Sequence, residues 1–254
     1  MYFLYKGAGA PASPPRVARW LKEAGAPQPT EAYRGPDVPA WLKDGLQDVL
    51  RSLKWGETQA GSVVTSLPSN VRDALRLARR ALSTTWVEAW DEHNMLVQYL
   101  VFTCGPLRSA TLQATFGVVY AELEEASDPL RMYELLLHET AHHALALKEQ
   151  FTQFLDNPNA VGTHALRPDP RPLRGVLHAA FVMCRLAEGL GRYLEAHPSG
   201  GPLDGCPVRE RHAFALKSLC EALTVLDDTA VWTEDGCALR ATLGVCLERE
   251  GAPA

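Results

Sequence analysis

Two histidines in the middle of the chain have the spacing of metal ligands on a helix. The segment His138-Glu139-Thr140-Ala141-His142 places them four positions apart, directly after the apolar run Leu135–Leu137. On an α-helix this spacing is about one turn with about 40° of rotation, so both imidazoles leave the same face. Imidazole nitrogens bind divalent transition metals. The pattern therefore predicts a metal site on a buried helix; the alternative is a pair of core histidines bonded to backbone.

A third metal ligand is expected farther along the chain, at His178. His143 is rotated about 100° from His142, so it cannot serve the same ion. Pro172 suits the first position of a helix. A helix from Pro172 to about Ala196 would place His178 in its second turn.

Two arginines precede His178 and suggest an anion site. Arg174 lies one turn before it, and Arg171 lies about two turns before it if the helical path extends that far back. Positive side chains at a helix N-terminus have the wrong sign for the helix dipole, and a bound anion would offset this. Guanidinium groups bind carboxylates through two parallel hydrogen bonds. We therefore expect a carboxylate pocket beside the metal; the alternative is surface arginines paired with Asp169 or Glu188.

Three blocks of sequence resemble the HExxH-motif peptide-modification proteins, namely His138–His142, Phe154–Pro158 and Arg167–His178. Those proteins occur beside genes for ribosomally made, post-translationally modified peptides, and some hydroxylate side-chain β-carbons with Fe(II) and 2-oxoglutarate. The match covers about residues 127–195. The resemblance implies a mostly helical scaffold in place of the usual jelly roll (cupin). It also implies His138, His142 and His178 as iron ligands, and Arg171 or Arg174 as the 2-oxoglutarate anchor.

Three functions compete. The first is an iron(II)- and 2-oxoglutarate-dependent dioxygenase that hydroxylates a side chain of a ribosomal precursor peptide; three histidines depart from the common set of two histidines and one carboxylate. The second is a zinc metallopeptidase in which Glu139 activates water as general base. No close H-x-x-G-x-x-H extension follows His142 to support it. The third is a catalytically inactive module that binds a leader peptide. In an oxygenase Glu139 could orient water, accept a hydrogen bond from a ligand histidine, or contact the peptide.

The chain of 254 residues is long enough for one large domain or two small ones. We expect a single catalytic domain over 1–254, with a helical part in 1–90, strands and metal helices in 91–200, and further helices in 201–254. The β-branched and aromatic stretches Val97–Thr103 and Thr111–Leu123 predict strands. The expected fold is α+β: mainly helical, with a small antiparallel sheet.

Several local signals predict where helices begin. Ser127-Asp128-Pro129 combines a capping side chain, an acid and a proline ahead of the metal helix. An irregular connection is expected between Phe151 and Pro172. The remaining predicted helices are Arg16–Ala24, Val38–Leu53, Val71–Leu82, Pro207–Leu226 and Thr233–Glu250, the last capped by Thr233.

Composition and charge limit the classes of partner and the cellular location that we expect. A formal net charge of −5 without a basic run argues against a nucleic-acid binder. No stretch approaches 18 uncharged apolar residues, so no membrane span is expected. The first residues lack the pattern of a secretion signal, and none of the six cysteines forms a C-x-x-C pair. These features indicate a cytoplasmic protein.

Overall fold

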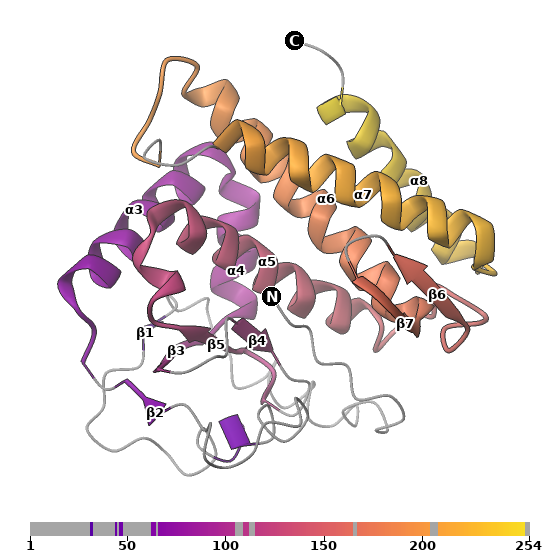
Figure 1. Cartoon of the computed structure of the whole chain (residues 1–254), viewed down its shortest axis with the longest axis horizontal. Helices are drawn as coiled ribbons and strands as arrows, with labels where there is room; N and C mark the ends of the chain where they lie inside the picture. The colour runs from indigo at the N-terminus through magenta and orange to yellow at the C-terminus, as the bar shows by residue number, and fades with distance from the viewer. Residues whose placement is uncertain are drawn as a thin grey trace. The chain divides into compact units, whose positions relative to one another are not determined.

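A computed structural model of the chain divides into two compact units, residues 1–144 and 145–254 (Figure 1). The described chain is mainly helical with two small sheets, which confirms the predicted α+β class in its coarse form. The predicted helix Arg16–Ala24 lies outside the described residues, and of Val38–Leu53 only 44, 46 and 47 are described, in helical conformation. The structure describes residues 31–32, 44, 46–47, 62–64, 66–104, 109–111, 115–164, 167–203 and 208–251.

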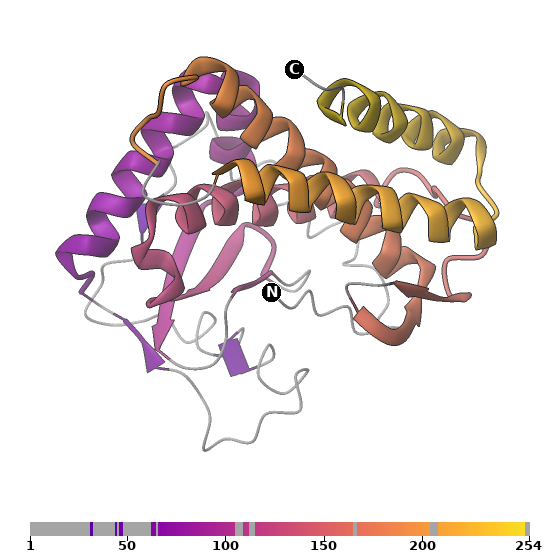
Figure 2. The ribbon, with the colours of Figure 1, turned by 45° about the horizontal axis from the view of Figure 1, so that its top comes forward.

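The first unit combines helices with a small sheet. Figures 1 and 2 both show α3, α4 and α5 on one side of its strands. The helices are α3 (Ser69–Thr85), α4 (Val87–Leu96), η3 (Glu125–Ser127) and α5 (Pro129–Lys148), whose last residues belong to the second unit. The strands are β1 (Glu31–Ala32), β2 (Ser62–Val63), β3 (Tyr99–Cys104), β4 (Ser109–Thr111) and β5 (Val118–Glu122).

The sheet of the first unit is mixed, whereas the sequence predicted an antiparallel one. Its strand order is β1-β3-β5-β4, and β2 also pairs with β3. The strands β3 and β5 run parallel, from Tyr99 opposite Val118 to Thr103 opposite Glu122. A short strand, β4, comes between them in sequence and pairs antiparallel with β5. The chain therefore reverses once more before β5, which makes β5 parallel to β3.

The start of α5 confirms the predicted boundary but corrects its cap. The backbone N–H of Arg131 donates to the Asp128 carboxylate at 2.8 Å. Ser127 instead donates its hydroxyl to the carbonyl of Glu124 at 2.7 Å and closes η3. Asp128 is therefore the N-cap, and its negative charge also suits the positive end of the helix dipole.

The helix α5 is buried on all sides over most of its length. Every residue from 132 to 146 is buried. A helix without an exposed face is a core helix, and any polar side chain on it needs a partner inside the protein. The buried polar residues of this stretch are Glu134, His138, Glu139, Thr140, His142 and His143.

The second unit is built on two long helices that pack side by side, α6 (Leu173–Ala196) and α7 (Val208–Thr229), with α8 (Glu234–Gly251) beside them (Figures 1 and 2). The observed bounds agree with the predicted helices to within one residue at each start. The Thr233 hydroxyl accepts the N–H of Gly236 at 3.0 Å, which confirms Thr233 as the cap of α8.

A β-hairpin replaces part of the irregular connection predicted before α6. It consists of β6 (Val161–His164) and β7 (Arg167–Pro172), paired antiparallel. Prolines at alternate positions of β7 lack an N–H, and such strands occur at sheet edges. In a two-stranded sheet every strand is an edge, so β7 tolerates a composition that does not resemble a strand.

Candidate functional site

His138 and His142 lie side by side on α5, as their spacing predicted. Their Nε2 atoms are 3.1 Å apart, and their rings meet edge to face with centroids separated by 4.7 Å. Both side chains are buried. Two ligands bonded to one ion at about 2.0–2.2 Å and about 90° apart are themselves about 3 Å apart. The separation therefore fits two ligands of one metal ion, and equally a hydrogen bond in which one neutral ring donates to the other.

The Glu139 carboxyl faces strand β4. Burial raises its pKa from 4.5 to about 7; the hydroxyls of Ser109 and Thr111 oppose this without outweighing it. The residue is only 2% exposed. The carboxyl is thus a buried group that carries a proton for part of the time near neutral pH.

Two further histidines of the first unit are neutral core groups. His93 Nδ1 lies 2.7 Å from the Thr140 hydroxyl, and the ring of His143 meets Phe116 edge to face. Burial lowers the pKa of His93 to about 3, with smaller contributions from the charges of Arg79 and His143. Burial likewise lowers the pKa of His143 to about 4. Both rings therefore stay uncharged in the folded chain at neutral pH.

His178 and Arg174 share the carboxylate of Glu149, a residue that was not among the predicted site residues. The Glu149 carboxylate accepts two bonds from Arg174, from Nε at 2.8 Å and from Nη2. The same carboxylate lies 3.0 Å from His178 Nε2. Burial lowers the pKa of Arg174 to about 10. A sequence signal existed, because Glu149 follows His142 by seven residues and so continues the same helical face.

Arg171 lies on β7 and not on the helical path that the sequence predicted. A Cβ atom on Gly175 would come within 3.9 Å of the Arg171 side chain. The Arg171 side chain therefore passes beside the first turn of α6. Of the alternative partners predicted for Arg174, Glu188 pairs instead with Arg192 and Arg249.

The start of α6 is held by the segment that precedes the hairpin. The N–H groups of Leu173 and Arg174 donate to the carbonyls of Ala160 and Pro158, at 2.8 and 3.0 Å. The cap position, Pro172, makes no side-chain cap bond, so these carbonyls satisfy N–H groups that a helix leaves open. These backbone hydrogen bonds fix the position of the Arg174 backbone, from which its side chain extends.

Asn157 ties the same segment to the loop between α7 and α8. Its side chain donates to the carbonyl of Thr229 at 2.9 Å and accepts the N–H of Val231 at 2.7 Å. The N–H of Asp156 donates to the carbonyl of Val231 at 2.8 Å. The block Phe154–Pro158, which carries part of the resemblance, therefore has a structural role in the second unit.

The candidate residues divide between the two units. His138, Glu139 and His142 belong to the first unit, whereas Arg171, Arg174 and His178 belong to the second. Among the described residues, no group of three or more His, Cys, Asp and Glu side chains could hold a metal ion. The three-histidine ligand set therefore stays a prediction.

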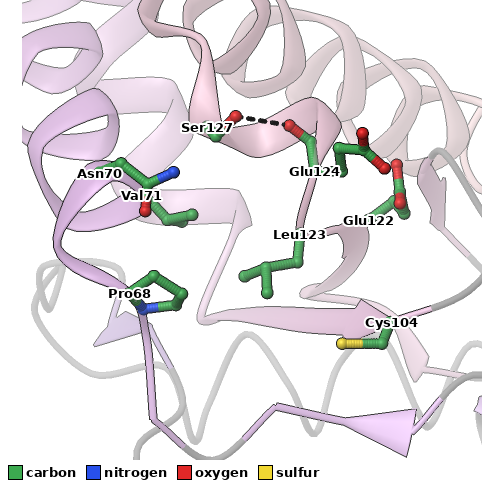
Figure 3. Close-up of a pocket in the computed structure, with 8 residues that line it drawn as sticks. All are labelled: Pro68, Asn70, Val71, Cys104, Glu122, Leu123, Glu124 and Ser127. Carbon is green, nitrogen blue, oxygen red and sulfur yellow. Dashed lines mark hydrogen bonds between the residues drawn. The ribbon is translucent and has the colours of Figure 1, made fainter.

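A separate pocket of about 380 Å³ opens in the first unit at the ends of β3 and β5 (Figure 3). None of the candidate residues lines it. Its lining residues are Pro68, Asn70, Val71, Cys104, Glu122, Leu123, Glu124 and Ser127.

No profile of a known protein family matches the sequence, and a comparison with curated proteins finds no match. None of the helices that the structure describes combines the length and the apolar character needed to cross a membrane.

Proposed function

We propose that this chain is an iron(II)- and 2-oxoglutarate-dependent oxygenase that hydroxylates the β-carbon of a side chain in a ribosomal precursor peptide. The observation that carries the proposal is the 3.1 Å separation of His138 Nε2 and His142 Nε2 on a buried helix. These two nitrogens fit adjacent ligands of one ion. The resemblance implies His178 as the third ligand.

The second support is chemical. Arg174 donates to the Glu149 carboxylate through its Nε–Nη2 edge, so this side chain suits the distal carboxylate of 2-oxoglutarate. Arg171, beside the first turn of α6, remains the alternative anchor. When bound, iron(II) and 2-oxoglutarate use dioxygen to turn a C–H bond into C–OH, with release of succinate and carbon dioxide. The peptide substrate and a cytoplasmic location rest on the resemblance and on the composition.

One observation favours a zinc peptidase as the second candidate. The pKa of Glu139, raised to about 7 by burial, is near the value that suits a general base at neutral pH. Against this, the Glu139 carboxyl is buried against Ser109 and Thr111 of β4, where the attacking water would also have to fit. We therefore propose that Glu139 acts through its contacts with β4 inside the first unit and does not activate water.

Labelled dioxygen separates the two candidates. The iron-loaded chain is incubated with a candidate precursor peptide and 2-oxoglutarate under ¹⁸O₂, and the masses of the products are measured by mass spectrometry. An oxygenase places one labelled atom in the intact peptide and one in succinate. A peptidase cleaves the peptide and takes its new oxygen from water. Cleavage without label would contradict the proposal.

A matched pair of variants makes the assay specific. His142→Gln removes a proposed ligand from the buried helix, whereas His197→Gln changes a half-buried histidine of α6's C-terminal end that contacts Tyr193. We expect the first variant to lose iron and labelled product together. We expect the second to keep both.

A further inference from the structure

The Arg174–His178 site already contains a carboxylate, and it belongs to the chain itself. Glu149 bonds the Nε–Nη2 edge of Arg174 and lies against His178 Nε2. The three side chains are largely shielded: that of Arg174 is 19% exposed, that of Glu149 11% and that of His178 2%. All three belong to the second unit.

This site can hold one carboxylate at a time on that edge. A guanidinium edge presents two parallel N–H groups, and a carboxylate that binds in bidentate fashion uses both of them. A second carboxylate would find the same donors taken and would meet the negative charge of the first. An external acid that binds the edge must therefore displace Glu149.

Glu149 is the side of this contact that lies outside a helix. It is the first residue after α5, in a turn that leads to Phe151, which is 76% exposed. Its side chain can rotate about three bonds toward solvent. Arg174 and His178, by contrast, are fixed on α6, whose first N–H groups are bonded to Ala160 and Pro158. Displacement would therefore move Glu149 and leave the backbone that carries Arg174 and His178 in place.

The geometry points to Glu149 as an internal competitor that fills the Arg174–His178 carboxylate site until a small dicarboxylate displaces it. The choice of 2-oxoglutarate as that dicarboxylate rests on the proposed function. The consequence is that the chain binds its co-substrate more weakly than the bare site would, because each binding event must first break the contacts of Glu149.

The test compares the full chain with Glu149→Gln, which keeps the side-chain length and removes the charge. Binding of 2-oxoglutarate is measured by calorimetry without added metal. We expect the variant to bind about tenfold more tightly or better, a difference of about 1.4 kcal/mol. Unchanged affinity, weaker affinity, or no binding by either protein would overturn the inference. Arg174→Gln in the same variant should remove the gain.

A matched control distinguishes displacement from a general loss of negative charge. Glu188→Gln removes the negative charge of another largely buried glutamate in the same unit, which pairs with Arg192 and Arg249. Its 2-oxoglutarate affinity should equal that of the unmodified chain. An equal gain in this control would show that charge alone, and not release of the site, explains the result.

A second measurement works if Glu149→Gln fails to fold. In the unmodified chain labelled with ¹³C at glutamate carboxylates, Glu149→Asp identifies the Glu149 signal by its loss. Saturating 2-oxoglutarate should shift that signal toward the position of a solvated carboxylate. A Glu149 signal that stays unchanged while 2-oxoglutarate binds would overturn the inference.

Failure of this inference and failure of the proposed function give different results. If Glu149→Gln binds 2-oxoglutarate more tightly but the iron-loaded chain forms no labelled product, the function fails and the internal competitor stands. If labelled product forms but Glu149→Gln does not tighten binding, the function stands and the internal competitor fails.

Discussion

Acid should destabilise the chain through His93, and the structure sets the size of the effect. Burial lowers the pKa of this histidine from 6.5 to about 3. A group with a lower pKa in the folded chain takes up its proton preferentially on unfolding. Its contribution to stability is therefore present above pH 6.5 and is lost as the pH falls toward 3.

The magnitude follows from the distance between the assay pH and the unfolded pKa. The assay pH of 5 is about 1.5 units below the unfolded pKa of 6.5, so the unfolded imidazole is protonated, while the folded imidazole is still neutral. At about 1.36 kcal/mol per unit, the folded state loses about 2 kcal/mol relative to neutral pH. His143, whose pKa is lowered to about 4, adds a loss of similar size.

Other groups also titrate in this range. The test therefore compares the loss of unfolding free energy between the two pH values in the unmodified chain and in a variant without His93. Glu139 acts with the opposite sign, because its raised pKa stabilises the folded chain as the pH falls from about 7 toward 4.5. His93→Gln keeps a hydrogen-bonding group toward Thr140 and cannot titrate. Urea unfolding of the metal-free chain at pH 7.5 and pH 5 should show a loss that is about 2 kcal/mol smaller for the variant.

Thr140→Ser serves as the control for this experiment. It perturbs the same contact, at 2.7 Å from His93 Nδ1, and keeps the titrating ring. Its loss of stability between the two pH values should match that of the unmodified chain. If His93→Gln shows the same acid loss as the unmodified chain, His93 is not held neutral by burial and the reasoning fails.

Three further changes test the local structure. Asp128→Ala should lower the free energy of unfolding by about 1 kcal/mol, and Ser127→Ala by less, because Asp128 caps α5; equal losses would refute this assignment. Arg174→Ala should weaken 2-oxoglutarate binding by about 2–5 kcal/mol in calorimetry at unchanged metal content, and Arg174→Lys should restore it only in part. Asn157→Ala should lower the urea midpoint by removing two hydrogen bonds, about 1–2 kcal/mol together, whereas Asn159→Ala should not.

Helix periodicity and capping chemistry were readable from the sequence. The one-turn spacing alone brings His138 and His142 together, because both sit on a single helix. Pro172 marks the start of α6 and Thr233 that of α8, since each effect depends on a few neighbouring residues. The cap of α5 was less certain, because Ser127 and Asp128 are both good capping residues and only the path of the chain selects Asp128.

Features that depend on contacts between distant parts of the chain could not be predicted from the sequence. The parallel pairing of β3 with β5 depends on where the short strand β4 inserts. The strand β7 has three prolines, so its composition indicates no strand. The partner of Arg174 is Glu149, which lies 25 residues earlier. The spacing from His142 places Glu149 on the histidine face of the helix, but no local pattern pairs it with Arg174.

The most direct test of the central claim needs no peptide. The chain is loaded anaerobically with iron(II) and titrated with 2-oxoglutarate while the visible spectrum is recorded. We expect a weak charge-transfer band of a chelated 2-oxo acid, which is absent with His138→Gln, with His142→Gln and when zinc replaces iron. An iron-loaded chain that binds no 2-oxoglutarate and develops no band would contradict it.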